Sequence, residues 1–369
     1  MSHSRNPRVL VLWADAHSSN LGVQALAAGT KYLVSAIAKS AEVSHLSYGP
    51  ARSKNIKLTA RNLSLAMLGM NKELTAFLAT FDLVVDTGAG DSFSDIYGMR
   101  RLSEMSALRA LIQRLEIPLV LGPQTIGPFD TVLGRLVAKK SVGTQAVVIA
   151  RDYSSRDSAE TLLKRTVPLA SDVVFLLPAE HSGKRSGVSL NVSGLLWQKN
   201  SHVDYKFYRE QVIEFAESAI GSGKKLTLVS HVIDPSHPDN DIDSVDECSR
   251  ILGKKAEIFH PEDLADIRSH LASAEIVVAA RMHAVLNSLS QGVPAVAWSY
   301  SRKFAPLLSD LGWQHNFDLR ERRSSISADT LKLVISSRTL DREAEGVRRN
   351  AYARMTSVIE YLKGIADKQ

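Results

Sequence analysis

The stretch AARMHAVLNSL, residues 279–289, places an arginine and a histidine where an apolar helix should begin. A helix N-terminus carries partial positive charge, so Arg281 without a partner would be disfavoured there by roughly a few tenths of a kcal/mol. An anion lying between the guanidinium and the helix amides reverses that sign, because arginine pairs with carboxylate or phosphate through two parallel hydrogen bonds. His283 titrates near neutrality and can donate a hydrogen bond or pass a proton. Together with Lys303, which follows the next apolar run, these residues predict a site for an anionic ligand.

Two earlier loops also carry polar residues after apolar runs. Residues 14–29 contain the turn Asn20-Leu21-Gly22, which leads into a helix whose first amides could hold an anion or be capped by Ser and Asn side chains. Residues 86–95, DTGAGDSFSD, combine two glycines with the carboxylates of Asp91 and Asp95. The glycines allow a ligand to approach the backbone, although the third glycine of a dinucleotide fingerprint is absent. A solvated glycine-rich turn is the alternative for this loop.

Two further loops follow the same pattern. Residues 122–130, GPQTIGPFD, form a loop stiffened by two Gly-Pro steps, and Gln124 and Thr125 add polar groups to it. RDYSS at 151–155 begins with Arg151 at the end of an apolar run, and its Asp and Ser residues can cap the next helix. Because ligands of parallel α/β folds bind at the carboxyl ends of strands, Arg151 is a candidate binding residue.

Three other features are expected to be structural. GSGKK at 221–225 lacks the first glycine of a phosphate-binding loop and precedes a strand, which indicates a helix-to-strand turn. DNDID at 239–243 is expected to cap the following helix, with a metal-binding aspartate cluster as the alternative. Cys248 is expected to pack in the core.

The elements that must hold these residues alternate between short β-branched runs and longer amphipathic stretches. This rhythm predicts parallel sheets with helices on both faces. The predicted strands are 9–13, 43–46, 83–86, 119–122 and 146–150, and then, beyond a Gly- and Pro-containing linker at 171–187, residues 188–192, 226–231, 257–259, 276–279 and 295–298. We therefore expect a Rossmann-like N-terminal domain at 1–172, a Rossmann-like C-terminal domain at 187–340 and a C-terminal helix at 341–369.

The composition, 44% hydrophobic and 23% charged, is typical of a soluble globular protein. The net charge of +6 suits an anionic ligand or membrane surface, whereas the scattered Lys and Arg residues do not indicate a nucleic-acid partner. A single cysteine excludes an internal disulfide and a cysteine-based metal site. No segment approaches the ~20 apolar residues of a membrane span, and the first apolar run is short for a signal peptide. We expect a cytoplasmic protein whose contact with the inner face of the membrane is peripheral.

The order of these motifs resembles the polysaccharide pyruvyl transferase family. The resemblance extends from about residue 9 to residue 313 and is carried by NLGVQAL, DTGAGDSFSD, GPQTIGP, RDYSS, SHVIDPSHPDNDID and AARMHAVLNSLSQGVPAVAWSYSRK. Its most specific part is the series Arg-x-His, Gly-Val-Pro and Tyr-x-x-Lys.

The resemblance implies a fold like that of the GT-B glycosyltransferases. It also implies phosphoenolpyruvate as donor co-substrate and a sugar of a cell-surface glycan, free or lipid-linked, as acceptor. The product would be a pyruvate ketal on two sugar hydroxyls, with phosphate released and without a cofactor or metal. The C-terminal domain would be the donor side and the N-terminal domain the acceptor side.

The family pattern implies that Arg151, Arg281 and His283 hold the donor, and together with the loop residues above it leads to the following expectations. His283 and Arg281 are the expected catalytic residues. The expected donor-binding residues are Arg151, Arg281, His283, Lys303 and Gln124, and the expected acceptor-binding residues are Asn20, Gln24, Asp91 and His231.

One position departs from the family. Many members carry an acidic residue directly after the glycine of the first turn, where this chain has Val23, and Asp91 and Asp95 are candidate substitutes. Two other functions stay open: a GT-B glycosyltransferase that uses a nucleotide sugar, and a binding protein without catalysis.

Overall fold

The computed structural model describes residues 5–47, 58–180, 183–237 and 239–366. The chain forms two compact units. Unit 1 comprises residues 1–16, 26–173 and 353–369, and unit 2 comprises residues 17–25 and 174–352.

Unit 1 is built on a five-stranded parallel sheet in the order β2-β1-β3-β4-β5. The strands are β1 (Arg8–Leu12), β2 (Glu42–Leu46), β3 (Leu83–Asp86), β4 (Leu119–Gln124) and β5 (Val147–Ala150). Four consecutive residues of β1 are buried, as expected of a strand covered on both faces. The chain leaves β1 toward β2 and later returns to the other side of β1 with β3, so the topological switch point lies between β1 and β3.

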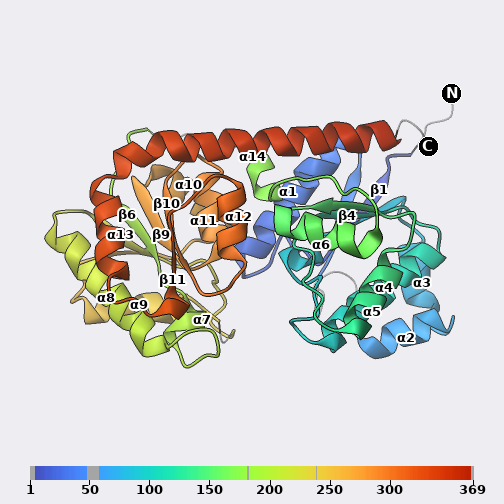
Figure 1. The fold of residues 1–369 in the computed structure, drawn as a ribbon, viewed down its shortest axis with the longest axis horizontal. Helices are drawn as coiled ribbons and strands as arrows, with labels where there is room; N and C mark the ends of the chain where they lie inside the picture. The colour runs from blue at the N-terminus through green and yellow to red at the C-terminus, as the bar shows by residue number, and fades with distance from the viewer. Residues whose placement is uncertain (1–4, 48–57, 181–182, 238, 367–369) are drawn as a thin grey trace. The chain divides into compact units, whose positions relative to one another are not determined.

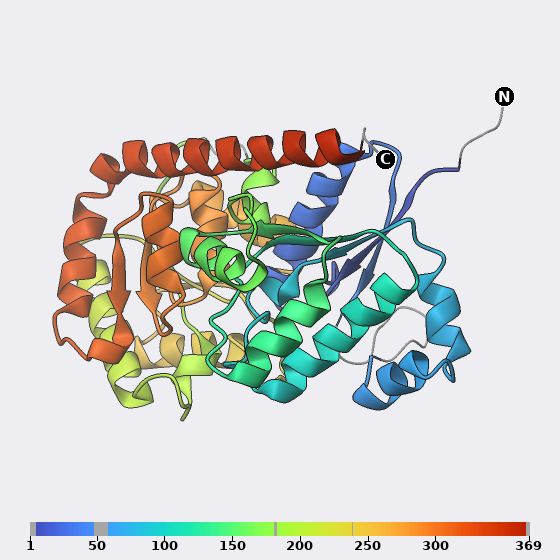
Figure 2. The same cartoon turned by 45° about the vertical axis from the view of Figure 1, so that its right-hand side comes forward.

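Helices cover both faces of this sheet, with α1 on one face and α4 and α5 on the other (Figures 1 and 2). The elements are α1 (Leu21–Ile37, which begins in unit 2), α2 (Ala60–Met67), α3 (Lys72–Leu78), η1 (Gly88–Gly90), α4 (Met99–Arg114), α5 (Val132–Val142), α6 (Tyr153–Leu163) and η2 (Val173–Leu176). Local sequence explains where two of the helices begin. Thr131 accepts a hydrogen bond from the Gly134 amide at the start of α5, and Asp152 accepts one from the Ser155 amide at the start of α6, as the sequence indicated for RDYSS.

Unit 2 is built on a six-stranded parallel sheet in the order β11-β10-β9-β6-β7-β8. The strands are β6 (Val188–Asn191), β7 (Leu226–Val229), β8 (Glu257–Phe259), β9 (Ile276–Ala279), β10 (Ala295–Ser299) and β11 (Asn316–Asp318). Here the chain runs from β6 to β7 and β8, then returns to the other side of β6 with β9. The switch point of unit 2 therefore lies between β6 and β9, where ligands of such sheets bind.

The helices of unit 2 also lie on both faces of its sheet, with α8 and α9 on one face and α10, α11 and α12 on the other (Figure 1). They are α7 (Gly194–Trp197), α8 (Tyr205–Gly221), α9 (Ile242–Ile251), α10 (Leu264–Ser273), α11 (Met282–Leu289), α12 (Phe304–Asp310), η3 (Leu319–Glu321), α13 (Ile326–Ile335) and α14 (Ser337–Ala366). Helix α14 begins in unit 2 and its last residues belong to unit 1.

The prediction of two Rossmann-like parallel sheets is confirmed, and every predicted strand is present within a few residues. The short strand β11 was not predicted. Residues 17–25 were predicted to belong to the N-terminal domain and here belong to unit 2. Residues 353–366, predicted as part of a separate C-terminal helix, belong to unit 1.

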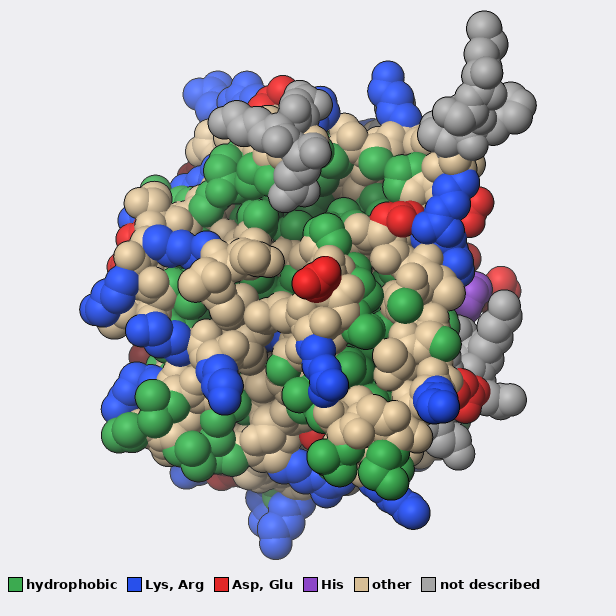
Figure 3. Space-filling model, turned by 90° about the vertical axis from the view of Figure 1, so that its right-hand side faces the viewer, with side chains coloured by type: hydrophobic (Ala, Val, Ile, Leu, Met, Phe, Trp, Pro, Cys, Tyr) green, Lys and Arg blue, Asp and Glu red, His purple; other side chains and the backbone are tan. Residues whose placement is uncertain are grey.

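Two properties of the surface and of the helices bear on partners. On the face shown in Figure 3, Lys and Arg side chains are scattered among hydrophobic and neutral ones and do not gather into one basic patch. Among the described residues, no helix combines the length and the apolar character that crossing a membrane requires.

Candidate active site

The polar centre of unit 2 lies at its switch point. Asn191 is the last residue of β6, and Arg281 follows β9 as the N-cap residue of α11. The Asn191 carboxamide oxygen accepts a hydrogen bond from the Arg281 amide (3.1 Å), and its Nδ2 donates to the Val229 carbonyl (3.1 Å). This one buried side chain therefore ties together the ends of β6, β7 and β9.

The carboxylate of Asp241 is the central acceptor of this region. It is fully buried, and only hydrogen-bond donors surround it. Its Oδ1 accepts from the Gly194 amide (2.8 Å) and from Arg281 Nε and Nη2 (3.2 and 2.7 Å), and its Oδ2 accepts from the His231 and Val232 amides (3.0 and 3.1 Å) and Asn191 Nδ2 (3.2 Å). The prediction that the 239–243 stretch caps the next helix was wrong for this side chain. Asp241 occupies the N-cap position of α9 without a side-chain capping bond, because its oxygens are committed to Arg281 and the loops. The described residues contain no group of three or more His, Cys, Asp or Glu side chains suited to a metal.

Arg281 forms an ion pair with the Asp241 carboxylate. Burial opposes its charge, but the neighbouring Asp241 carboxylate outweighs burial, so the pKa of Arg281 is raised. Asp241 holds the Nε–Nη2 edge, and Nη2 also donates to the Asp239 carbonyl. Nη1 makes no hydrogen bond with the described part of the chain. The guanidinium is thus fixed along one edge and has donors left for a ligand.

His283 lies on the first turn of α11 against the turn that opens α1. The amide of Gly22 donates to Asn20 Oδ1 (3.0 Å), and a Cβ added at Gly22 would lie 2.8 Å from His283 Nδ1. The turn is attached to the loop after β7, since the Leu21 amide donates to the His231 carbonyl (3.1 Å). A glycine at position 22 therefore allows the imidazole to pack directly against the backbone.

Two of the predicted acceptor residues are engaged within unit 2. Gln24 is buried, its Nε2 donates to the Ser18 carbonyl (2.7 Å), and its Oε1 accepts from the Leu264 amide (3.0 Å). Its amide therefore shapes the turn. His231 is also buried, and burial lowers its pKa to about 3, so its ring stays neutral near pH 7. Its Nε2 has no hydrogen-bond partner among the described residues.

Lys303 follows β10, the strand next to β9, and is the N-cap residue of α12. Its side chain is half-buried. Tyr300, on the same loop, is close enough to Arg281 to raise the pKa of that arginine, although less than Asp241 does. The loop after β10 therefore borders the Arg281 region, as the sequence predicted for SYSRK.

The remaining predicted donor residues lie at the carboxyl edge of the unit 1 sheet. Arg151 is almost fully buried, and its Nη1 donates to Asp172 Oδ2 (2.9 Å) while its Nη2 donates to Thr125 Oγ1 (2.5 Å). Gln124 is fully buried and donates through Nε2 to the Asp86 carbonyl (2.8 Å), and its Oε1 has no hydrogen-bond partner among the described residues.

A left-handed turn lies beside these residues. Gly88, Ala89 and Gly90 have φ values of 56°, 51° and 82°. A Cβ at Gly88 would lie 1.8 Å from Gln124 Oε1, and one at Gly90 would lie 3.8 Å from Arg151 Nη1. The glycine at position 88 therefore allows the close approach of Gln124, whereas Gly90 is needed for its positive φ.

The two candidate carboxylates of the same loop differ in their surroundings. Asp91 accepts a hydrogen bond from the Tyr97 hydroxyl (2.9 Å). Asp95 accepts from the Asp130 and Thr131 amides and from Thr131 Oγ1. Partial burial raises the pKa of Asp95, but these bonds outweigh it and lower the pKa. Asp95 therefore stays ionised and holds the segment before α5.

A buried ion pair supports the unit 1 edge. Arg109 Nε lies 2.6 Å from Asp86 Oδ2, both side chains are fully buried, and the guanidinium lies 3.9 Å from the centre of the Phe93 ring. Sequence reasoning missed this pair because Arg109 lies within α4 without a motif around it. The other missed residues, Asn191 and Asp241, had a signal, since both are polar residues next to predicted strands or loops.

The structure thus brings the predicted residues together in two groups. Asn20, Gln24, His231, Arg281 and His283 share contacts within unit 2, and Gln124 and Arg151 lie at one edge of unit 1. Both groups lie at the carboxyl ends of parallel strands.

One family profile matches most of the chain. The profile of the family described as polysaccharide pyruvyl transferase matches residues 20–302, which include every predicted site residue except Lys303. No curated protein sequence matches this chain.

Solved structures share the fold across nearly the whole chain. A putative UDP-N-acetylglucosamine 2-epimerase from Listeria monocytogenes is 12% identical with a TM-score of 0.59, covering 99% of this chain and 98% of that one. Anabaena Alr3699/HepE in complex with UDP and glucose is 12% identical with a TM-score of 0.57, covering 98% and 99%. The UDP-GlcNAc 2-epimerase from Neisseria meningitidis bound to UDP-GlcNAc is 11% identical with a TM-score of 0.58, covering 96% and 99%. These similarities assign the GT-B fold to this chain.

Proposed function

This chain belongs to the polysaccharide pyruvyl transferase family, and we propose that it transfers pyruvate from phosphoenolpyruvate to a sugar of a cell-surface polysaccharide or its precursor. The observation that carries the proposal is the pairing of Arg281 with His283 at the unit 2 switch point. Arg281 is fixed by Asp241 along one edge and keeps Nη1 for an anion, and the imidazole of His283 lies two residues later, in the first turn of α11.

The reaction needs positive charge and a proton donor. Phosphoenolpyruvate carries a phosphate and a carboxylate, and Arg281 and Lys303 of unit 2 supply cations to bind them. Protonation of the methylene carbon makes the enol carbon electrophilic, and a sugar hydroxyl adds to it and loses its proton, which replaces the one given to the methylene. The bond from this carbon to the phosphate oxygen then breaks, a second hydroxyl of the sugar adds and closes the ketal, and the proton of that hydroxyl leaves with the phosphate. His283 is the proton donor in this scheme.

The proposed chemistry uses neither a metal nor an organic cofactor, because the side chains named above neutralise the departing phosphate. The acceptor belongs to the class of glycans or lipid-linked sugars. Since phosphoenolpyruvate is a cytoplasmic metabolite, we place the reaction in the cytoplasm, with peripheral membrane contact for a lipid-linked acceptor.

The test is phosphate release from phosphoenolpyruvate in the presence of candidate sugars, with mass spectrometry of the glycan. A product heavier by one pyruvate ketal is expected, and a chelator should leave the rate unchanged. UDP-sugars serve as the comparison donors. Glycosyl transfer from a UDP-sugar without phosphate release from phosphoenolpyruvate would replace the proposal with a nucleotide-sugar glycosyltransferase.

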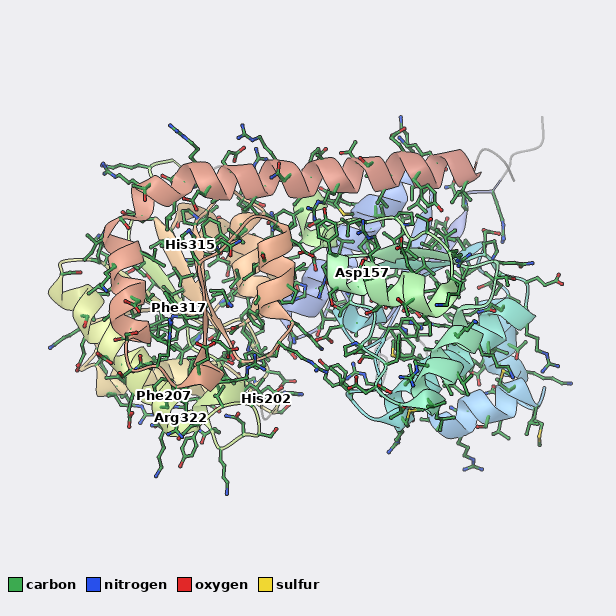
Figure 4. All side chains as sticks on the ribbon, in the orientation of Figure 1. Asp157, His202, Phe207, His315, Phe317 and Arg322 are labelled. Atoms are coloured by element: carbon green, nitrogen blue, oxygen red, sulfur yellow. The ribbon has the colours of Figure 1, made fainter. Side chains whose placement is uncertain are left out.

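The substitution His283→Gln should lower kcat by at least about a hundredfold, because general acid–base catalysis contributes roughly that much or more. His315→Gln is the matched control. His315 (labelled in Figure 4) lies just before β11, at the amino end of this strand, and its Nε2 forms a hydrogen bond with Glu343 (2.9 Å). Near-normal turnover by His283→Gln, with the thermal unfolding midpoints of the variants alike, would remove His283 from the mechanism.

A further inference from the structure

A pocket lies in unit 2 near Arg281. It has a volume of about 300 Å³, the lower end of the range for small-ligand sites. One wall is formed by residues 235–237 and Asn240 of the loop before α9 and by the first turn of α9, and the other is α7 with the residue that follows it. The lining residues used below are Trp197, Gln198, Ser236, His237, Asn240 and Asp243.

The pocket and Arg281 share the loop between β7 and α9. The carbonyl of Asp239 accepts a hydrogen bond from Arg281 Nη2, and the adjacent Asn240 lines the pocket. The same loop contacts the opening turn of α1, because Ser19 Oγ donates to Asp234 Oδ2 (3.4 Å). A ligand in this pocket would therefore be held beside whatever Arg281 binds.

The pocket offers both hydrogen-bond donors and acceptors. His237 Nδ1 accepts from the Asp239 amide (3.1 Å), so in the neutral ring Nε2 carries the proton and can donate. The Ser236 hydroxyl donates to Asp234 Oδ1 (2.6 Å), which leaves its oxygen as an acceptor. The side chains of Gln198 and Asp243 are exposed and make no hydrogen bond with the described residues.

The charges around the pocket disfavour anions. Asp243 lines it, and Asp234 lies behind Ser236, whose side chain and amide lower the pKa of Asp234 and keep it ionised. A phosphate, a carboxylate or a nucleotide diphosphate would meet these carboxylates without a lysine or arginine in the lining. A neutral molecule rich in hydroxyl groups meets no such repulsion, and carboxylate and amide side chains bond well to hydroxyls.

The floor beneath these groups is closely packed. Trp197 is fully buried, and its Nε1 donates to Glu247 Oε2 (2.8 Å). Gly194 allows the loop to approach, because a Cβ there would lie 1.8 Å from the Asn240 carbonyl oxygen.

We propose that this pocket binds the ring of a neutral sugar through its hydroxyl groups and is the acceptor subsite of unit 2. The assignment as an acceptor subsite rests on the proposed function, whereas the binding of a neutral sugar does not. Asp243 and Gln198 are the specificity-determining side chains.

The test is ligand-observed NMR on the full chain with the methyl glycosides of glucose, galactose, mannose and N-acetylglucosamine. At least one should bind saturably, and Asp243→Asn and Gln198→Ala should each weaken that binding about tenfold. The matched control is Asp157→Asn, an exposed carboxylate on α6 of the other unit (Figure 4). Absence of saturable binding across the four glycosides, or equal binding by wild type and both variants, would overturn the proposal.

Kinetics separate this inference from the proposed function. With an active acceptor, Asp243→Asn should raise the KM for the sugar about tenfold and leave the KM for phosphoenolpyruvate unchanged. An unchanged sugar KM would refute the subsite while the pyruvyl transfer stands. Sugar binding that is lost in Asp243→Asn, without any pyruvyl transfer by wild type, would support the pocket and reject the proposed function.

Discussion

Asp241 explains how a buried arginine can stand at the start of α11. Its carboxylate carries the negative charge that balances the guanidinium next to the positive end of the helix. It also accepts hydrogen bonds from backbone amides that follow β6 and β7. The same six hydrogen bonds therefore fix the charge and the shape of the site. Asp241 acts through Arg281 and is a positioning residue.

The substitution Asp241→Asn should lower kcat/KM for phosphoenolpyruvate at least tenfold and reduce stability. Both carboxylate oxygens accept hydrogen bonds from donors. In the asparagine variant an NH₂ group replaces one oxygen, and this group would face those donors without an acceptor. Breaking a buried ion pair from one side costs about 3–5 kcal/mol. Steady-state kinetics and thermal unfolding measure the two effects.

A double-mutant cycle with Arg281→Lys distinguishes a role of Asp241 in positioning Arg281 from a general loss of structure. If Asp241 acts through the guanidinium, Asp241→Asn should lower kcat/KM much less in the Arg281→Lys background than in wild type. The loss of stability from the loop hydrogen bonds should persist in both. Equal effects on kcat/KM in the two backgrounds would contradict a role through Arg281.

Sequence reasoning at this scale located the cations and missed the partner that Arg281 has within the protein. Arg281, His283 and Arg151 were recognised because a cation or a proton donor at a strand end needs an explanation. The explanation offered for Arg281 was a bound anion, whereas the structure shows Asp241 as its partner. Nothing in DNDID distinguishes a capping aspartate from one that reaches back to another strand, since that choice depends on tertiary contacts 40 residues apart.

At the scale of elements, the turn η1 stores backbone strain beside Arg151. Ala89 has φ 51° and ψ 31°, a left-handed conformation that costs a non-glycine residue about 1–2 kcal/mol. Ala89→Gly should relieve this strain, offset in part by the greater entropy of glycine in the unfolded chain. We expect Ala89→Gly to stabilise unit 1 by up to about 1 kcal/mol, measured by urea unfolding.

The neighbouring Gly88→Ala should do the opposite. The new Cβ would lie 1.8 Å from the Oε1 atom of the buried Gln124, which is held by its bond to the Asp86 carbonyl. Gly69→Ala is the matched control, because Gly69 has a φ of 74° but no atom within 4 Å of an added Cβ. Gly88→Ala should be the more destabilising of the two; equal losses would show that the contact with Gln124 contributes nothing.

At the scale of the whole molecule, the sequence predicted the two sheets but not which unit each segment joins. The two parallel sheets were predictable, because a buried parallel strand is a short β-branched run and each crossover is an amphipathic helix. The sequence did not predict to which unit residues 17–25 and 353–366 belong. These segments adjoin or continue helices, and the residues that they contact lie far away in the sequence. The periodicity of apolar residues identifies a helix, but it does not indicate which sheet the helix covers.

The buried His231 makes the stability of the whole molecule depend on pH. Its pKa falls from 6.5 to about 3, first because of burial and then through the charges of His283 and Arg281, while Asp241 opposes the shift. Below pH 6.5 the unfolded chain binds a proton that the folded chain does not, so stability falls as the pH decreases from about 6.5 toward 3. For this group alone, the loss between pH 7 and pH 5 is roughly 2 kcal/mol.

The substitution His231→Asn should remove this part of the pH dependence. The urea unfolding midpoint of unit 2, followed by a probe specific for that unit, should fall less between pH 7 and pH 5 in the variant than in wild type. Above pH 7 the two curves should run parallel, because His231 is then neutral in both the folded and the unfolded chain. A variant whose midpoint falls as steeply as wild type would show that His231 takes up its proton in the folded protein, and that the ring facing His283 is charged under acidic conditions.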